Sequence, residues 1–288
     1  MTWKILNEII NKQPARSKLP PTFTNNNKDI SDPYTIANKF CEVFTNMGPD
    51  LTKKLPPSDI SHSSFLKNKI SEIIFLKPVT EDEIKKLSSS FKAGKACGYD
   101  GIKIADVKSN IDFLAPPLTY LINLSISSGS VPDDIKMARV IPIYKSDCRS
   151  TFNNYRPISI LPPLSKFYEK VMYDRIVSFI CKHNVLYEFQ YGFRANHSTN
   201  LDIMQLIKLL LLLTKERSVL AGIFLDLSRA FDTVNHKILV EKSEHYGIRG
   251  IALDWITSYL NNRKQFLECN NVFSESKIIN VVFLKEVY

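Results

Sequence analysis

An apolar run that ends in a carboxylate constrains this chain more than any other feature. Residues 219–227 read Val-Leu-Ala-Gly-Ile-Phe-Leu-Asp-Leu, which predicts a strand with Asp226 at its carboxyl end. Helical patterns precede and follow this run, so we expect helices combined with a sheet. The carboxyl end of a strand is a usual place for a metal-binding oxygen. The run alone leaves a second interpretation open, because Asp226 could simply cap the turn that follows.

The composition is typical of a globular chain with a polyanionic partner. Of 288 residues, 44% are hydrophobic, which is enough for a sizeable core. The formal net charge of +9 favours nucleic acid, because clustered Lys and Arg gain affinity for phosphate backbones by releasing counterions. An ordinary basic surface is the alternative. The five cysteines form no Cys-x-x-Cys pair, and no signal-peptide pattern opens the sequence, so we expect an intracellular chain that is not secreted.

Periodicity predicts the order of the elements. Residues 1–76 hold two amphipathic helical patterns around a polar linker at 20–27, and we expect this extension to pack loosely. A capping box at Thr80 predicts the next helix start, and the apolar run 206–213, too short to cross a bilayer, predicts a buried core helix. The other elements expected are helices over about 114–126 (ending at Gly129), 165–182, 198–215, 237–246 and 252–260, a β-prone run at 138–145, and a hairpin joining 264–269 to 276–282 about Asn270 and Asn271.

Basic residues precede the carboxylate strand in three distinctive runs. Lys145 ends the β-prone run, Arg156 lies in Asn-Tyr-Arg-Pro-Ile, and Arg194 closes Gln-Tyr-Gly-Phe-Arg. Nucleotidyl transfer needs cations around the incoming triphosphate, and Arg can hold phosphate oxygens through a bidentate fork. Taken singly, each of these residues is more often a solvated surface charge.

The order of these runs resembles the reverse transcriptases of non-LTR retrotransposons, particularly the jockey and CR1-like group. The resemblance extends over about 77–279, and the matching segments are 141–145, 154–159, 190–194, 197–199, 224–236 and 245–250. It implies a right-hand polymerase fold of the α+β class. The fingers would occupy 77–215 and an incomplete palm 216–288, after a helical N-terminal extension over 1–76.

The resemblance also implies the metal ligands and a gate for the sugar. Asp226 becomes a catalytic carboxylate that binds Mg²⁺, and the backbone carbonyl of Leu227 shares in the coordination. Phe231 becomes a steric gate, because its ring would clash with a ribose 2′-hydroxyl and so select deoxynucleotides. Asp232 falls outside the family's metal triad, and we assign it to structure, as a cap for the following helix.

Nucleotide and template contacts follow from the same resemblance. Lys145 and Arg156 belong to the fingers and grip the triphosphate of the incoming nucleotide. Gln190 and Arg194 lie near the template strand. For Gly192-Phe193, between them, a turn with a core aromatic is an equally good interpretation.

The chain departs from the family after the predicted hairpin. The Gly-Val-Pro-Gln-Gly loop and the Tyr-x-Asp-Asp hairpin are not in the sequence, so we expect weak metal binding and no polymerase activity from the isolated polypeptide. A DNA sequence that encodes residues 282–286 can also encode Gly-Val-Pro-Gln-Gly when its reading frame is moved back by one base. Our hypothesis is that a frameshift or a splice error near Asn280 cut the polymerase sequence short. Loss of the sheet neighbours then predicts open edges, exposed apolar surface and aggregation.

Together these features predict the reverse transcriptase domain of a mobile element, with an RNA template, a DNA primer and dNTPs as partners and no membrane. Copying RNA into chromosomal DNA would require access to the nucleus, and we expect an intracellular location, in the nucleus or the cytoplasm. Two alternatives stay open: a noncatalytic nucleic-acid-binding module built on the same basic residues, or the product of a pseudogene.

Overall fold

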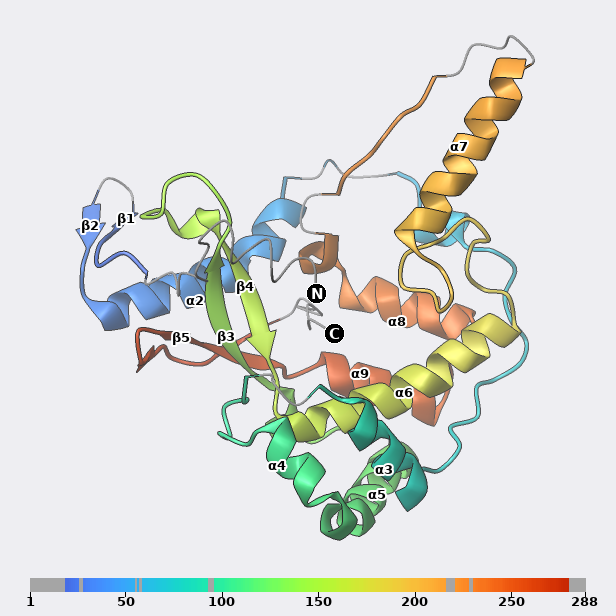
Figure 1. Cartoon of the computed structure of the whole chain (residues 1–288), viewed down its shortest axis with the longest axis horizontal. Helices are drawn as coiled ribbons and strands as arrows, with labels where there is room; N and C mark the ends of the chain where they lie inside the picture. The colour runs from blue at the N-terminus through green and yellow to red at the C-terminus, as the bar shows by residue number, and fades with distance from the viewer. Residues whose placement is uncertain are drawn as a thin grey trace, which may run out of the picture.

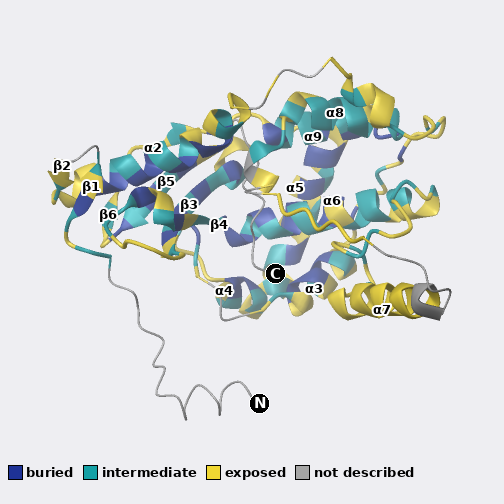
Figure 2. Ribbon diagram, turned by 90° about the horizontal axis from the view of Figure 1, so that it is seen from above, coloured by how far each residue is buried: buried dark blue, intermediate teal, exposed yellow. Residues whose placement is uncertain are grey.

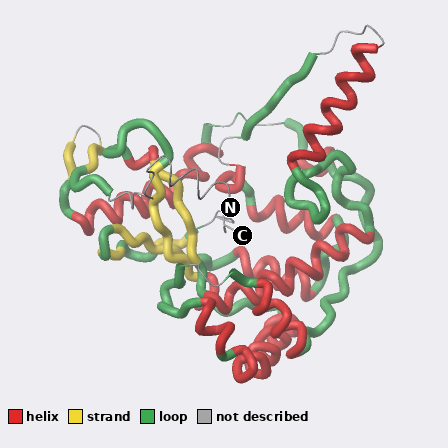
Figure 3. The backbone as a smooth tube through the Cα atoms, in the orientation of Figure 1, coloured by secondary structure: helices red, strands yellow, loops and turns green. Residues whose placement is uncertain are grey.

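The computed structural model describes residues 19–25, 28–54, 56, 59–92, 96–215, 221–227 and 230–279. It mixes helices and strands, which confirms the expected α+β class (Figure 1). The strands gather on one side of the molecule, and most of the helices lie on the other (Figure 3). None of the described helices combines the length and the apolar character needed to cross a bilayer.

Eight α-helices and four short 3-10 helices lie in the described ranges. They are α2 (Pro33–Thr52), η1 (His62–Phe65), α3 (Glu81–Ser90), α4 (Ile104–Ser109), α5 (Ile111–Ser128), η2 (Asp133–Lys136), η3 (Phe152–Asn154), α6 (Pro163–Lys182), α7 (Thr199–Lys215), η4 (Ala230–Thr233), α8 (His236–His245) and α9 (Ile251–Leu260). The helices expected from periodicity within the described residues are therefore confirmed within a few residues of their predicted ends. At the end of α5, Gly129 adopts a left-handed φ of 63°, the conformation that favours glycine as a stop signal.

The strands form a small hairpin and a main sheet. They are β1 (Phe23–Asn25), β2 (Lys28–Ile30), β3 (Met137–Tyr144), β4 (Tyr155–Ile160), β5 (Lys264–Cys269), β6 (Val272–Phe273) and β7 (Lys277–Ile278). In the main sheet, β3 pairs antiparallel with β4 and parallel with β5, and both β6 and β7 run antiparallel to β5. The turn of the predicted hairpin is confirmed, because Asn270 and Asn271 both take the positive φ values that a tight turn needs. Of the second strand expected over 276–282, residues 277 and 278 pair with β5, and 280–282 lie outside the described residues.

One hydrophobic core joins α3, α5, α6 and α9. Its fully or nearly fully buried side chains include Ile84, Ile122, Phe167, Val171 and Trp255. Helix α3 begins as predicted, since the Thr80 hydroxyl accepts a hydrogen bond from the Glu83 amide at 3.3 Å. The Glu83 side chain also pairs with Arg175 of α6, and this ion pair ties the two helices together at the edge of the core.

A second core lies between α2 and the main sheet. Phe40 and Phe44 of α2 are fully buried beside Val140 of β3 and Leu267 of β5. The expectation of a loosely packed extension is therefore wrong for α2, because the apolar stripe of this helix faces the sheet rather than solvent. The described residues from 59 to 73 are mostly exposed. Part of the expected linker forms the β1–β2 hairpin, and the first amphipathic pattern falls at 1–18, outside the described residues.

Two expectations fail in the arm, by which we mean α7 together with residues 221–227. The apolar side chains at 206–212 are between 40% and 61% exposed, so α7 is not a buried core helix. Residues 221–227 are extended but form no strand with any described segment. A strand depends on a neighbour to pair its amide and carbonyl groups. Figures 1 and 2 show the arm projecting from the body, with exposed residues along its length.

Candidate active site

The β3–β4 hairpin brings Lys145 and Arg156 together. Its register pairs Ile143 with Arg156, and the Lys145 amide extends the ladder by donating to the Asn154 carbonyl at 2.9 Å. Side chains two residues apart on a strand share a face, as do directly paired residues. Both cationic side chains are exposed, on the face opposite the buried Val140. The hairpin can therefore present two positive charges to one anionic group.

Gln190 and Arg194 shape the turn in which they lie. The side-chain amide of Gln190 donates from Nε2 to the Gly192 carbonyl at 3.1 Å. The Arg194 Nη1 donates to the carbonyls of Tyr187 and Glu188 at 3.1 and 3.3 Å. These bonds close the segment 187–194 on itself. Each of the two side chains thus has at least one donor committed to the local backbone.

The same turn meets Phe231 of η4. The rings of Phe193 and Phe231 lie edge to face, with centroids 5.7 Å apart and planes at 90°. Edge-to-face packing is a favoured arrangement of two aromatic rings. The contact joins the Gln-Tyr-Gly-Phe-Arg run to the segment that follows the carboxylate, although the two are far apart in the sequence.

Asp226 and Leu227 lie in the exposed arm rather than in a buried strand. Leu227 is 75% exposed, and the Asp226 side chain is also exposed. A pair of Mg²⁺ ions needs several oxygen ligands from the protein. Among the residues that the structure describes, no group of three or more His, Cys, Asp or Glu side chains could hold a metal ion. The described residues therefore do not fit a two-metal site.

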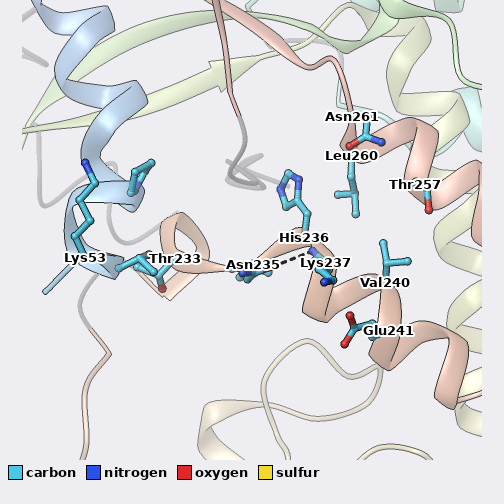
Figure 4. A pocket seen from close by; sticks show the side chains of 13 residues that line it. Lys53, Thr233, Asn235, His236, Lys237, Val240, Glu241, Thr257, Leu260 and Asn261 are labelled. Carbon is cyan, nitrogen blue, oxygen red and sulfur yellow. Dashed lines mark hydrogen bonds between the residues drawn. The ribbon is translucent and has the colours of Figure 1, made fainter. Parts of the chain in front are cut away.

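A cavity of about 910 Å³ lies beside η4, between the ends of α2, α8 and α9 (Figure 4). This volume is in the range of small-ligand sites. Lys53, Thr233 and His236 line it from three different elements. Asn235 caps α8, since its side-chain oxygen accepts from the Lys237 amide at 2.9 Å, and this bond is drawn in Figure 4.

His236 brings a buried ring nitrogen without a hydrogen bond to this cavity, as far as the described residues show. Its Nε2 atom is buried and has no hydrogen-bond partner within the described part of the chain. Burial, followed by the charge of Arg263, lowers the pKa of His236 below its ordinary value of 6.5. The imidazole is therefore neutral at pH 7 and can accept or donate a hydrogen bond, but it adds no positive charge.

Comparison with known proteins identifies the region that contains these residues. The family described as reverse transcriptase (RNA-dependent DNA polymerase) matches residues 143–282. This region, 140 of the 288 residues, is therefore similar to the reverse transcriptase family. The match covers Lys145, Arg156, Phe231 and the arm, and begins in β3.

Curated relatives extend the similarity beyond the reverse transcriptase match. The chain is 28% identical over 213 residues to the RNA-directed DNA polymerase from mobile element jockey of Drosophila melanogaster, covering 70% of this chain and 23% of the relative. The jockey polymerase of Drosophila funebris is 29% identical over 243 residues, or 83% and 26% of the two chains. The probable RNA-directed DNA polymerase from transposon BS of Drosophila melanogaster is 27% identical over 211 residues, or 71% and 22%.

These relatives confirm the jockey-like resemblance that the motifs predicted. The chain spans only 22% to 26% of their lengths. It therefore carries part of what a complete relative contains.

One motif of the reverse transcriptase region has a structural role that the sequence did not reveal. His245 and Arg249 bind the backbone of 67–71: the His245 Nε2 contacts the Lys67 carbonyl at 2.7 Å, and Arg249 donates to the Ile70 and Ser71 carbonyls at 2.5 and 3.2 Å. Gly247 has a φ of 90°, and an added Cβ would lie 2.5 Å from a backbone oxygen. The motif thus clamps an upstream segment onto α8 and α9.

Sequence reasoning also missed the cavity beside η4. Asn235 and His236 belong to a family-like run, and Asn before a helix predicts a cap. Lys53 carries no comparable signal, because it reaches the cavity from the end of α2. Residues of the matched region 143–282 and the end of α2, which lies outside that match, thus build this cavity jointly.

Proposed function

We propose that this chain supplies the fingers and the first palm segment of a polymerase that copies an RNA template into DNA, from a DNA primer and dNTPs. The observation that carries the proposal is the β3–β4 hairpin, whose register sets Lys145 and Arg156 on one exposed face. Two cations so placed can hold the phosphates of an incoming nucleotide. The names of the relatives, RNA-directed DNA polymerases, support the same activity.

The remaining roles follow from this proposal. Phe231 acts as the steric gate, while Gln190 and Arg194 lie near the template strand. Asp226 and the Leu227 carbonyl are the first ligands for Mg²⁺ in the complete enzyme. The fingers occupy 77–215 and the partial palm 216–288, after the extension over 1–76, and the site of action is the nucleus or the cytoplasm.

The chain by itself is proposed to lack polymerase activity. Asp226 is an exposed carboxylate, and the described residues bring no cluster of further acidic side chains to it. In-line transfer depends on metal ions that hold both reacting groups in place. Noncatalytic binding of nucleic acid is the second candidate, favoured by the net charge of +9 together with this isolated carboxylate.

Equilibrium dialysis with a labelled dNTP tests the proposal. We expect Lys145→Ala and Arg156→Ala to weaken dNTP binding by roughly tenfold each, because each removes a charge-assisted phosphate contact. Lys28→Ala is the control, since Lys28 is an exposed lysine of the separate β1–β2 hairpin. Equal dNTP affinity in the wild type and both variants would overturn the role of the hairpin.

Two further measurements separate the candidates. Salt-dependent binding of a labelled RNA without any dNTP binding would favour the noncatalytic module. Primer extension with Mg²⁺ on a primed RNA template tests the proposed inactivity. Extension by this chain alone would contradict it.

A further inference from the structure

We propose that Phe193 is a positioning residue for the steric gate: its ring supports the ring of Phe231 and fixes how that ring meets the sugar of a bound nucleotide. The inference rests on the proposed function, because Phe231 is assigned there as the gate. It adds a determinant of sugar selectivity from a different part of the sequence.

The geometry of the pair is the first observation. The Phe193 and Phe231 rings meet edge to face, with centroids 5.7 Å apart and planes at 90°. Phe193 is 83% exposed, so burial in a core does not explain its position. Phe231 is about one-third exposed, which leaves part of its ring open to a ligand while part is covered.

The backbone at Phe193 is the second observation. Its φ is 60°, in the left-handed region that a bulky L-residue rarely adopts. The hydrogen bonds of Gln190 and Arg194 to backbone carbonyls on either side of Tyr191 hold the turn closed. A strained residue that is held in place by its neighbours and directs an exposed ring at another ring is typical of a functional contact.

The surroundings of η4 complete the argument. Helix α2 contacts η4 on one side, where Pro49 and Lys53 share the cavity with Thr233. The backbone that carries Phe231 is therefore fixed by α2, and Phe193 restrains the ring itself. Without Phe193 the gate ring can change rotamer, and its clash with a 2′-hydroxyl should weaken.

The test compares dGTP with GTP, which differ only at the 2′ position. Equilibrium dialysis on the full chain gives the ratio of their dissociation constants. An aromatic pair of this kind stabilises by about 0.5–1.5 kcal/mol, so we expect Phe193→Ala to reduce the preference for dGTP by roughly two- to tenfold. Phe231→Ala should abolish the preference, and adding Phe193→Ala to it should change nothing further.

The matched control is Phe189→Ala. Phe189 lies in the same turn and is 56% exposed, but its ring packs on Tyr187 with centroids 5.5 Å apart. It should leave the dGTP preference unchanged. An equal loss in Phe189→Ala and Phe193→Ala would mean that both residues merely fold the turn, and would overturn the inference.

The other outcomes separate this inference from the proposed function. If the wild-type chain does not prefer dGTP, the gate assignment of Phe231 fails and the inference fails with it. If the wild type prefers dGTP and Phe231→Ala removes that preference while Phe193→Ala retains it, only the inference is overturned. Hydrogen exchange gives a readout independent of nucleotide: amides at 230–234 should exchange faster in Phe193→Ala, and unchanged exchange would contradict the contact.

Discussion

In the core between α2 and the main sheet, Phe40 is fully buried, whereas in the arm Phe224 is 85% exposed. Both regions have strongly apolar sequences, and α2 and α7 both form the helices that periodicity predicts, whereas residues 221–227 form no strand. Phe40 lies within 4.7–5.6 Å, centroid to centroid, of four other aromatic rings. Phe224 lies in a segment that pairs with no strand in the described ranges.

The difference teaches that apolar composition does not by itself make a core. Burial of apolar surface stabilises a fold only where a second apolar surface is available to cover it. Helix α2 finds one on β3 and β5, so its stripe is covered. In the arm, the apolar side chains at 206–212 stay 40% to 61% exposed, and exposed apolar surface of this kind favours association.

Truncating one ring in each region should give the largest contrast. Phe40→Ala should lower the free energy of unfolding by about 3–5 kcal/mol, because it removes a fully buried ring and leaves a cavity. Phe224→Ala should change it by less than about 0.5 kcal/mol. Urea unfolding followed by circular dichroism measures both. Similar losses in the two variants would mean that the arm is packed in solution.

The ion pair between α3 and α6 gives an intermediate effect that depends on pH. Glu83→Gln should lower the free energy of unfolding at pH 7 by about 1–2 kcal/mol, since Arg175, only 12% exposed, loses its charged partner. The hydrogen bonds from Arg175 hold the pKa of Glu83 below its ordinary 4.5. A carboxylate with a lowered pKa stabilises the fold above that ordinary value, and the contribution is lost as the pH falls through the folded-state pKa.

The stability difference between the wild type and Glu83→Gln should therefore persist from pH 7 to about 4.5 and shrink below it. Asp202→Asn is the control, because it removes an exposed carboxylate from the arm. Urea unfolding at several pH values measures both variants. A pH-independent difference for Glu83→Gln would show that the ion pair is not the cause.

Polar substitutions in the arm should have the smallest effect on stability. Ile203→Gln and Met204→Gln replace side chains that are 50% and 64% exposed, so the free energy of unfolding should change by less than about 0.5 kcal/mol. Light scattering should show less aggregation, because exposed apolar surface is lost. Ile122→Gln, at a buried position of the first core, is the opposing control and should be strongly destabilising. Unchanged scattering in the arm variants would rule out the arm as the source of aggregation.

Local signals predicted the helices and turns well. Thr80 marks the start of α3 through a hydrogen bond to a residue three positions away, and Gly129 marks the end of α5 through its own backbone angle. Neither signal depends on the rest of the chain. Of the strand expected at 219–227, the described part, 221–227, forms no strand, for the opposite reason: an apolar, β-prone run becomes a strand only when another strand pairs with it.

In the candidate site, too, local signals identified the residues, and the packing of distant segments decided how those residues are arranged. The sequence motifs singled out Lys145, Arg156 and Phe231, but the shared face of the two cations comes from the register of β3 with β4. The contact of Phe231 with Phe193 joins segments separated by α7. Neither relation follows from residue spacing, because each depends on how distant segments pack.

The sequence by itself determined the order of the helices, the turn at Asn270 and Asn271, and the motifs through which residues 143–282 match the reverse transcriptase family. These features depend on periodicity, capping and residue identity, which are local. Only the tertiary structure decided that the apolar stripe of α2 is buried, that the arm is exposed, and that the ring of Phe193 contacts the ring of Phe231. Burial and contact are properties of two surfaces at once, and a local pattern describes only one of them.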